Sequence, residues 1–375
     1  MKILFIISDL ETGGAEIQLY KLVEKVHEQY TIKVISLVSN GDVGRKLVAL
    51  GIPVTAMGMK RGNLFGTSFF KLLSEIKKYK PDVVHTWMYH ANLIGGLAAK
   101  LVNVKKIIWS IHQFDLTRQF NSAATLLVIK AGAFLSRLVP DQVICVSESV
   151  NKNHIAYGYF SKKMLVVPNG IDTNTFHFIE TARKEVLMEL GLADDLVLVG
   201  FFCRYHPIKD HAGFLMAFAK LKEDTTFSNV HAILAGGNVN NTNTELVQII
   251  ENLELSSYIH MLGNRDDMPR LMSSIDLFVN ASFNEAFSLV LGEAMACMVP
   301  SVSTIDGDPA GIVDKKELLV PAGKPDEMEA VMHSAILKMK NVDSWTELRV
   351  NCRAKIVEHY GLDAIVEHYR QIWAN

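Results

Sequence analysis

The segment 2–26, KILFIISDLETGGAEIQLYKLVEKV, decides the fold of the first half of the chain. Within it, Ile3–Ile7 is a short apolar run, as expected for a strand that is buried on both faces. The apolar residues of 19–26 then recur at the spacing of one helix face. A polar loop, residues 11–16, separates the two. Strand, loop and helix in this order are the unit from which parallel α/β sheets are built.

The same unit recurs along the rest of the chain. Short apolar runs rich in β-branched residues alternate with segments of helical periodicity in both halves. This alternation predicts an α/β protein with two Rossmann-like, doubly wound parallel-sheet domains. The further strands expected from it are Ile32–Leu37, Asp82–His85, Lys106–Trp109, Val143–Val146, Leu196–Phe202, Val230–Leu234, Ile259–Leu262, Leu277–Val279 and Val299–Ser303.

Length and turn residues place the domain boundaries. A chain of 375 residues exceeds what one hydrophobic core usually supports, and Pro168-Asn169-Gly170 supplies turn-forming residues near its middle. We therefore expect an N-terminal domain over 1–168 and a second domain over 169–357. An apolar face on 363–373 predicts a terminal helix. We expect the segment 358–375 that contains it to pack back on the first domain.

Composition excludes several classes of protein. Hydrophobic residues make up 49% and charged residues 21%, the balance of a globular chain and not of a disordered or fibrous one. No window is apolar for long enough to span a membrane, and the N-terminus lacks the features of a signal peptide. The four cysteines lie far apart, so we expect reduced thiols in a cytoplasmic protein, without a disulfide framework or a zinc site.

The charge is unevenly distributed. Residues 1–168 carry 21 Lys and Arg against 11 Asp and Glu, whereas the remainder carries 17 against 29. A basic half attracts anionic partners through its long-range field. Nucleic acid, an anionic membrane surface and a phosphorylated substrate each fit this asymmetry, and so does a solvated face that has no partner.

Two loops carry residues suited to binding a phosphate. Gly13-Gly14 opens the first helix, where backbone amides can approach an anion closely. This loop is not a GxGxxG dinucleotide fingerprint, and a flexible strand-to-helix turn explains its glycines equally well. Arg204 and Lys209 follow the strand expected at 196–202. They could clamp a diphosphate, or they could be two surface charges beside a loop.

Two acids stand eight positions apart in the segment 283–296, FNEAFSLVLGEAMA. If a helix begins after Glu285, Glu293 lies on its second turn, about 12 Å away by the helical rise. That separation is comparable to the distance between the sugar and the ribose hydroxyls of a nucleotide-sugar. The anionic linkage between them would face amides at the helix start, those of Phe287, Ser288 and Leu289. An acid among apolar neighbours is costly without a partner, which singles out Glu293.

With these residues assembled, the chain resembles the retaining glycosyltransferases of glycosyltransferase family 4, which have the GT-B fold. The resemblance covers essentially the whole chain and is most specific at Glu285-x7-Glu293, which runs into Ala294-Met295-Ala296. It implies two domains facing across a cleft and transfer of a sugar from a nucleoside diphosphate sugar. The other motifs that carry it are Thr12–Glu16, Val167–Asp172, Arg204…Lys209 and Leu262–Arg265.

The resemblance implies roles for the phosphate-binding residues. Gly13 and Gly14 would lie against the donor phosphates and the acceptor. Arg204 and Lys209 would neutralise the leaving diphosphate. These assignments follow the family's motif positions.

Further roles fall on the second half of the chain. Glu285 would hold sugar hydroxyls, and Glu293 would hold the ribose. The loop with Asn264 and Arg265 would meet the nucleobase through backbone groups. At Ser288 the family often has glycine, and a serine can still offer its backbone amide to the donor.

Three histidines of the first half are candidates. His112 follows a strand and is positioned like the family's active-site histidine, which contacts the transferred sugar near the reacting carbon. His85 and His90 lie at the carboxyl end of another expected strand, where ligands of such sheets gather. We expect these two to border the acceptor.

No metal and no other cofactor is expected. Asp306-Gly307-Asp308 looks like a DxD site for a divalent cation beside a diphosphate. Arg204 and Lys209 already supply the positive charge that such a cation would bring, so we interpret the segment as an acidic turn.

The resemblance implies a biological setting without fixing it. Enzymes of this type often build bacterial surface polysaccharides, such as O-antigen or capsule, on polyprenyl-diphosphate or lipid carriers. We expect a UDP-hexose or UDP-N-acetylhexosamine as donor, a hydroxyl of a glycan or lipid-linked carrier as acceptor, and no nucleic-acid partner.

One segment favours a position at the inner face of the cell membrane. Residues 123–139 are strongly apolar and carry only two cations, Lys130 and Arg137, which could reach lipid headgroups. The basic character of the same half adds to this expectation, through Lys60, Arg61, Lys71, Lys77, Lys78 and Lys80. A buried core helix is the commoner fate of such a stretch.

The mechanism and the function each keep an alternative. The sequence identifies no nucleophile on the far face of the sugar, so we expect same-face attack in which the leaving phosphate takes the acceptor's proton. A nucleotide-sugar epimerase shares the two-domain architecture and would turn over donor without acceptor. A non-catalytic sugar-nucleotide binding module would keep Arg204 and Lys209 but show no turnover.

Overall fold

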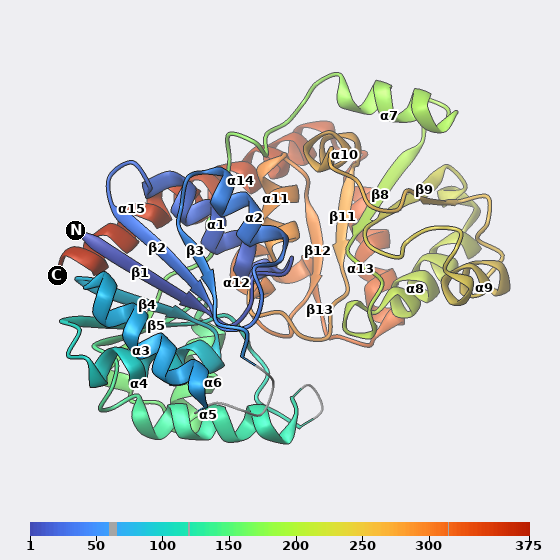
Figure 1. Cartoon of the computed structure of the whole chain (residues 1–375). Helices are drawn as coiled ribbons and strands as arrows, with labels where there is room; N and C mark the ends of the chain where they lie inside the picture. Colours follow the sequence, from blue (N-terminus) through green and yellow to red (C-terminus); the bar gives the residue numbers. More distant parts are fainter. Residues whose placement is uncertain (60–65, 119–120, 314) are drawn as a thin grey trace. The chain divides into compact units, whose positions relative to one another are not determined.

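The computed structural model describes residues 1–59, 66–118, 121–313 and 315–375 (Figure 1). Lys60 and Arg61 lie outside the described residues. The chain divides into two compact units, Met1–Gly170 with Leu362–Asn375, and Ile171–Gly361. The chain passes from the first unit to the second after Gly170 and returns to the first after Gly361. The sequence predicted boundaries after 168 and after 357. We refer to the two units as unit 1 and unit 2.

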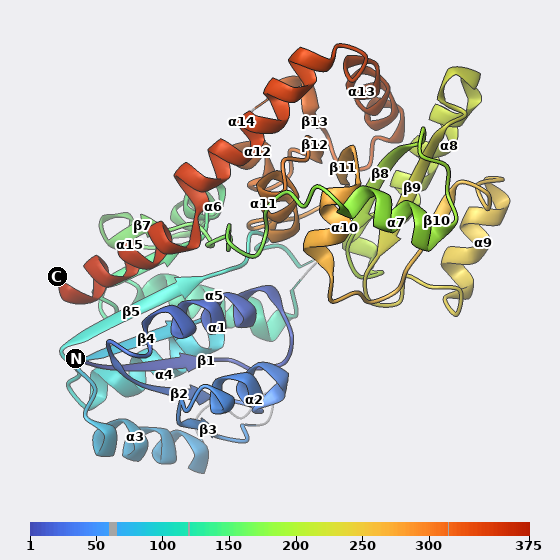
Figure 2. The ribbon, with the colours of Figure 1, turned by 90° about the horizontal axis from the view of Figure 1, so that it is seen from above.

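Unit 1 is built on a seven-stranded sheet in the order β3-β2-β1-β4-β5-β6-β7. Neighbouring strands pair in parallel throughout, and several are visible side by side in Figure 2. The strands are β1 (Lys2–Ile7), β2 (Thr31–Ser36), β3 (Val54–Ala56), β4 (Val83–Trp87), β5 (Lys106–Ile111), β6 (Gln142–Cys145) and β7 (Met164–Val166).

Helices cover both faces of this sheet. The helices are α1 (Gly14–Val26), α2 (Gly41–Ala49), α3 (Thr67–Tyr79), α4 (Tyr89–Leu101), α5 (Ala123–Leu135), α6 (Glu148–Tyr157) and the C-terminal α15 (Leu362–Ala374). Buried residues of α1, α2 and α15 share one hydrophobic cluster with β1. The helix α4 packs on the opposite face, where Gly96 lies against the indole of Trp109.

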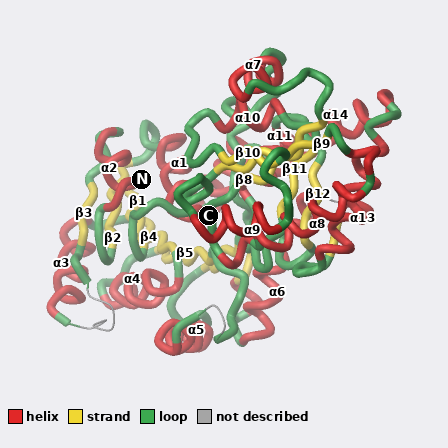
Figure 3. Tube along the Cα trace, turned by 90° about the vertical axis from the view of Figure 1, so that its right-hand side faces the viewer, coloured by secondary structure: helices red, strands yellow, loops and turns green. Residues whose placement is uncertain are grey.

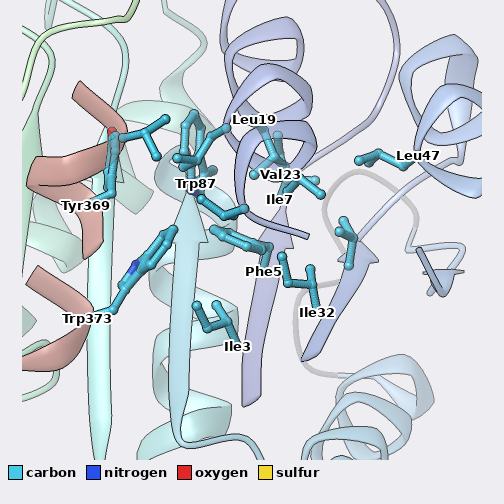
Figure 4. Close-up of a cluster of buried hydrophobic side chains, with 14 of the residues drawn as sticks. Ile3, Phe5, Ile7, Leu19, Val23, Ile32, Leu47, Trp87, Tyr369 and Trp373 are labelled. Atoms are coloured by element: carbon cyan, nitrogen blue, oxygen red, sulfur yellow. The ribbon is translucent and has the colours of Figure 1, made fainter. Parts of the chain in front are cut away.

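The terminal helix completes the core of unit 1. Leu362, Ile365, Val366, Tyr369 and Trp373 are buried at helical spacing and pack into the cluster around Phe5 and Trp87 (Figure 4). The ring centroids of Phe5 and Trp373 are 5.9 Å apart. The helix expected at 363–373 is therefore confirmed.

The turn at Pro168-Asn169-Gly170 is held inside unit 1 by one side chain. The amide group of Gln18, on α1, donates through Nε2 to the Gly170 carbonyl and accepts from the Gly170 N–H, both at 3.1 Å. A Cβ at residue 170 would lie 2.6 Å from Leu362 Cδ1. Glycine is needed here because Leu362, at the start of α15, leaves no room for a side chain.

Unit 2 is built on a six-stranded sheet in the order β10-β9-β8-β11-β12-β13, and its described strand pairs are also parallel. Figure 3 colours the strands yellow and the helices red. The strands are β8 (Val197–Phe202), β9 (Val230–Ala235), β10 (Ile259–Met261), β11 (Leu277–Asn280), β12 (Ser301–Thr304) and β13 (Leu319–Val320). The helices are α7 (Ala182–Leu190), α8 (His211–Glu223), α9 (Thr244–Asn252), α10 (Met268–Ser274), α11 (Leu289–Ala296), α12 (Pro309–Val313), α13 (Pro325–Lys338) and α14 (Val342–Tyr360).

Two doubly wound parallel-sheet units confirm the predicted fold class. Each of the ten strands expected from the sequence exists within a few residues of its predicted bounds. The three strands that the sequence did not reveal, β3, β7 and β13, are two or three residues long and lie at sheet edges. An edge strand is only half covered, so it needs no long apolar run and leaves little periodic signal.

Among the described residues, no helix is both long enough and apolar enough to cross a bilayer.

Candidate active site

The topology of each sheet marks where a ligand is expected. In open parallel sheets, ligands bind beyond the carboxyl ends of the strands, at the point where the strand order reverses. In unit 2 that point lies between β8 and β11, and in unit 1 between β1 and β4. Most of the predicted site residues fall in the loops that follow these strands and their neighbours. The exceptions within a strand or α-helix are Gly14 in α1, His85 in β4, His90 in α4, and Leu289 and Glu293 in α11.

Lys209 and Glu285 meet at the reversal point of unit 2. Lys209 ends a short 3₁₀ turn, Pro207–Lys209, in the loop after β8, and Glu285 lies in the loop after β11. The Lys209 ammonium forms an ion pair with Glu285 Oε1. Their side chains are 23% and 14% exposed, so the pair is largely shielded but reachable from solvent. The sequence identified both residues but not their contact.

Glu285 is held by neighbours that sequence analysis missed. The Ser282 hydroxyl donates to Glu285 Oε1 at 2.9 Å. The backbone carbonyl of Ser282 in turn accepts from Thr304 Oγ1 at 2.6 Å, at the end of β12. The carboxylate therefore occupies a fixed position at the sheet edge. A serine three residues before the acid is too common a pattern to have identified this contact.

The backbone of the segment Asp306-Gly307-Asp308 contacts the backbone of Glu285. Gly307 pairs with Glu285 in an isolated parallel bridge, and Asp308 N donates to the Glu285 carbonyl at 3.1 Å. Gly307 has φ +106°, and a Cβ there would lie 1.9 Å from the Glu285 carbonyl oxygen. Asp306 Oδ2 accepts from Ala322 N at 2.9 Å. Across the described residues, no group of three His, Cys, Asp or Glu side chains is arranged to hold a metal ion.

The helix after Glu285 begins later than expected. Helix α11 starts at Leu289, with Ser288 as its N-cap residue, so the amide of Phe287 precedes the helix. The Phe287 ring is buried instead, 5.6 Å from the ring of Tyr360. The physical reason is that this aromatic side chain fills the core beside α14. Glu293 lies on the second turn of α11, as predicted, and is half-buried.

Three loops of unit 2 are joined by backbone hydrogen bonds. Gly236 N donates to the Gly263 carbonyl at 2.8 Å, and Tyr205 N donates to the Gly237 carbonyl at 2.7 Å. Gly236 has φ +146°, and a Cβ there would lie 2.2 Å from the Cys203 carbonyl oxygen. Gly236-Gly237 was missed, although two glycines directly after a predicted strand were a usable signal.

The side chains on these loops divide into two kinds. Arg204 and Asn264 are exposed, and a Cβ on Gly237 would lie 3.6 Å from an atom of each. The Arg265 guanidinium instead bonds Asp267 Oδ1 at 2.8 Å and Glu189 Oε1 at 2.7 Å. Hydrogen bonds from Arg265 hold the pKa of Asp267 well below its usual range. The Arg265 side chain is therefore committed to this charge cluster. The contact of its backbone with a nucleobase stays a prediction.

The Gly13-Gly14 loop lies beyond β1, beside the reversal point of unit 1. Gly13 is the N-cap residue of α1, and Gly14 is exposed as the first helical residue. A Cβ on Gly13 would lie 2.3 Å from Glu16 Oε2, so this carboxyl group folds back over the loop. Burial raises the pKa of Glu16. The loop thus combines accessible backbone with a carboxyl group whose charge is disfavoured.

His112 immediately follows β5 and lies against Trp87, the last residue of β4. The two rings are stacked, with centroids 4.4 Å apart and planes at 19°. The residue is partly exposed, but both ring nitrogens are buried and have no hydrogen-bond partner among the described residues. Burial lowers the pKa of His112 to about 3, so the ring is neutral near neutral pH.

The other two histidines differ from expectation in part. His85 is fully buried, and both of its ring nitrogens have partners inside unit 1, Ser110 Oγ at 2.8 Å and Trp373 Nε1 at 3.4 Å. It cannot border an acceptor in this arrangement, because its side chain points into the core covered by α15. His90 is half-buried on the first turn of α4. Its acceptor-side role stays a prediction.

Two family models match the chain in succession. Residues 12–175 match the model described as Glycosyltransferase Family 4, and residues 195–337 match the model described as Glycosyl transferases group 1. The first match covers most of unit 1, and the second covers the loops of unit 2 described above.

Several curated relatives align over most of their length. One is the UDP-Gal:alpha-D-GlcNAc-diphosphoundecaprenol alpha-1,3-galactosyltransferase of Escherichia coli, which is 26% identical over 82% of this chain and 78% of its own. Another is the N,N'-diacetylbacillosaminyl-diphospho-undecaprenol alpha-1,3-N-acetylgalactosaminyltransferase of Campylobacter jejuni, 25% identical over 77% of each chain.

Solved structures share the fold over the full length. The crystal structure of Anabaena HepE in complex with UDP has a TM-score of 0.86 and 22% identity, and covers 100% of both chains. A second structure of the same protein contains UDP-glucose and has a TM-score of 0.84. Taken with the two family models, the parallel-sheet units and the Glu285…Glu293 loop place this chain among the GT-B glycosyltransferases, with a family 4 domain followed by a group 1 domain.

Proposed function

We propose that the chain transfers a sugar, with retention of anomeric configuration, from a UDP-hexose or UDP-N-acetylhexosamine to a hydroxyl of a lipid-linked or glycan acceptor in surface-polysaccharide synthesis. The observation that carries this proposal is the meeting of Lys209 and Glu285 at the reversal point of the unit 2 sheet. A cation for a diphosphate and an acid for sugar hydroxyls stand side by side there, where such sheets bind ligands.

The choice of donor rests on the comparisons. Anabaena HepE was solved with UDP and with UDP-glucose, and the Escherichia coli relative is named for UDP-Gal. The choice of acceptor rests on relatives whose names place the acceptor sugar on diphosphoundecaprenol. These are properties of those proteins, and we extend them to this chain as a hypothesis.

The geometry suggests how the leaving group is stabilised. Negative charge grows on the diphosphate as the bond to the sugar breaks, and groups already aimed at that charge lower the barrier. Lys209, Arg204 and the first amides of α11 supply this stabilisation. Both contacts of Glu285 described above end on Oε1, so we assign Oε2 to a sugar hydroxyl.

His112 is assigned to the transferred sugar. Positive charge develops at the reacting carbon, and an imidazolium ion beside it would oppose that charge. A neutral ring avoids the repulsion and can still donate one hydrogen bond. We propose that the acceptor attacks from the face the diphosphate leaves, and that a departing phosphate oxygen takes the acceptor's proton.

We further propose association with an anionic membrane through α5. Leu127 and Phe134, on one side of this helix, are 68% and 76% exposed, and Leu138 just beyond it is 58% exposed. Lys130 and Arg137 are exposed between them. Apolar side chains that enter the interface, together with cations that reach lipid phosphates, suit an anionic surface. The inner face of the cell membrane is where a lipid-linked acceptor would be found.

A donor screen tests the proposed chemistry. A nucleotide-sugar that binds the folded state at 100 times its Kd stabilises it by about 2.7 kcal/mol, which thermal shift detects. We expect UDP-sugars to raise Tm more than GDP- or ADP-sugars. Lys209→Met should abolish the shift. Lys220→Met, which removes an exposed ion pair with Asp326 in the same unit, should not.

Turnover is measured with the selected donor and a short-chain polyprenyl-diphosphate N-acetylhexosamine. We expect product whose new linkage has the anomeric configuration of the donor, read by NMR. An inverted linkage, or a covalent sugar adduct on a carboxylate, would contradict the proposed mechanism. Donor conversion without acceptor would indicate an epimerase, and binding without turnover a non-catalytic module.

Metal independence is tested in the same assay. Because Arg204 and Lys209 provide the charge opposite the diphosphate, we expect the rate to stay unchanged after dialysis against EDTA. Loss of turnover that Mg²⁺ or Mn²⁺ restores would overturn this expectation.

Gly307→Ala tests the position of Glu285. A Cβ there would collide with the Glu285 carbonyl, so the variant should lose about tenfold or more in kcat/KM, because small displacements in a site cost this much. Gly191→Ala is the matched control, since Gly191 also has positive φ but no atom within 4 Å of its Cβ position. Both substitutions should cost about 1 kcal/mol in backbone strain. Equal kcat/KM in the two variants would exclude the supporting role.

Membrane binding is tested by co-sedimentation with vesicles. The double variant Leu127→Ser, Phe134→Ser should bind phosphatidylglycerol vesicles several-fold more weakly than the unsubstituted chain, and rising salt should weaken binding of both. Met188→Ser with Val342→Ser, which removes equally exposed apolar side chains from unit 2, is the control. Binding that is absent at low salt, or indifferent to the α5 substitutions, would rule out this surface.

A further inference from the structure

A buried aromatic cluster connects the C-terminal helix to His112. Trp87 pairs in register with Ser110 on the adjacent strand β5, and His112 stands two residues beyond Ser110, directly after the end of that strand. Alternate residues of a strand share one face, so all three side chains lie on the face that α15 covers. Trp87, Ser110 and Tyr369 are at most 3% exposed.

Trp87 makes two near-parallel ring contacts, which we call the stack. Its ring lies 4.4 Å from that of His112, with the planes at 19°. The ring of Tyr369, on α15, lies 6.4 Å from that of Trp87, with the planes at 25°. Near-parallel rings in contact restrict one another's rotation, because tilting one forces a shift in the next. His112 has no hydrogen-bond partner for either nitrogen among the described residues, so packing, with the Trp87 contact as part of it, orients the ring there.

Hydrogen bonds fix the far end of the stack. Trp373 Nε1 can only donate, so His85 Nδ1 accepts and the proton of the neutral His85 ring is on Nε2. That N–H donates to Ser110 Oγ at 2.8 Å, and Ser110 is also a hydrogen-bond partner of Tyr369. The phenol ring of Tyr369 is therefore anchored to the sheet through a chain of directional bonds.

The backbone after Trp87 is strained. Met88 has φ 75° and ψ 157°, a region almost confined to glycine. Such a conformation costs about 1–3 kcal/mol and persists only where the surroundings impose it. Here Met88 N donates to the Ser110 carbonyl at 3.0 Å, and the Asn92 side chain donates to the same oxygen at 3.0 Å. These hydrogen bonds maintain the strained conformation of Met88, and the turn thereby fixes the position of Trp87 at the end of β4.

We propose that Trp87 and Tyr369 are positioning residues for the transfer reaction: the stack they form sets the orientation of the His112 ring and keeps water from its buried nitrogens. The inference rests on the proposed function, because only a role of His112 at the transferred sugar makes its orientation matter. If the inference holds, α15 contributes to catalysis through Tyr369 and the orientation of His112, and not through contact with either substrate.

His112 is neutral because it is buried, and burial lowers its pKa to about 3. The Trp87 ring covers one face of it. Two titratable groups share the aromatic cluster with it: His85 on β4, whose pKa burial also lowers to about 3, and Tyr369 on α15, whose pKa burial raises. Both are uncharged at working pH. Opening the stack to water should therefore let the pKa of His112 rise toward its ordinary value of 6.5.

The test compares Trp87→Leu with Trp109→Leu. Trp109 is a fully buried tryptophan of unit 1 whose side chain points to the opposite face of the sheet, against Gly96 of α4. Each substitution removes the same atoms from the same unit, but only the first removes the ring beneath His112. Trp87→Phe keeps a flat ring and serves as the conservative variant, and Tyr369→Leu removes the outer ring.

The first measurement needs no substrate. The His112 ring is followed by NMR of histidine-labelled protein, with His112→Gln to assign its signal. We expect no titration of His112 between pH 5 and 8 in the unsubstituted chain, in Trp109→Leu or in Trp87→Phe. In Trp87→Leu the signal should titrate within this range. A His112 that stays non-titrating in Trp87→Leu would overturn the proposal.

The second measurement is kcat/KM for transfer as a function of pH. We expect Trp87→Leu and Tyr369→Leu to lose about tenfold or more, and Trp87→Leu to decline further below pH 7 as His112 gains a proton. Trp87→Phe should recover most of the rate, and Trp109→Leu should show no new acid limb. Equal losses and equal pH profiles in Trp87→Leu and Trp109→Leu would mean that Trp87 acts only in packing.

The two measurements separate the inference from the proposed function. If His112→Gln leaves kcat/KM unchanged, the assignment of His112 to the sugar fails whatever the stack does. If His112→Gln is inactive while Trp87→Leu keeps both the NMR behaviour and the rate, only the positioning role fails. Should Trp87→Leu not fold, Tyr369→Leu is compared with Trp109→Leu in both measurements. Titration of His112 and a loss of rate in Tyr369→Leu alone support the proposal, and equal behaviour of these two variants overturns it.

Discussion

The ion pair between Lys209 and Glu285 is the interaction on which the site of unit 2 depends. It joins residues 76 positions apart, and it forms because β8 and β11 are neighbours in the sheet although two strands separate them in sequence. Each partner is held by its own loop, Lys209 by the 3₁₀ turn after β8 and Glu285 by Ser282 and Gly307. A half-buried carboxylate is stable here because a cation and a hydroxyl compensate its lost hydration.

Unit 1 depends in the same way on a contact between distant segments. Its core is complete only with the last residues of the chain, since Tyr369 and Trp373 fill the space beside Phe5 and Trp87. The same aromatic rings reach the edge of the sheet at His112. One cluster therefore both packs the core of unit 1 and carries, at its outer end, the ring that we assign to the transferred sugar.

Much of the fold could be predicted, and less of the site. The ten expected strands and the terminal helix were confirmed because a fully buried element leaves a periodic apolar signal in its own residues. The ionisable residues stood out because an acid such as Glu293 among apolar neighbours is unusual. His85 was placed at an accessible edge in error, since its position in the strand gave no information on the helix that covers it. Ser282, Gly236 and Gly307 were missed because their importance comes from neighbours far along the chain.

By itself, the amino-acid sequence determined two parallel α/β units and the family motifs, because hydrophobic periodicity and turn chemistry are local properties. Only the tertiary structure decided which of these residues meet. Strand order brings Glu285 to Lys209 and Gly307, and the return of the chain as α15 brings Tyr369 to Trp87 and His112. Neither follows from spacing, because contacts across a sheet are set by the order and register of strands that are remote in sequence.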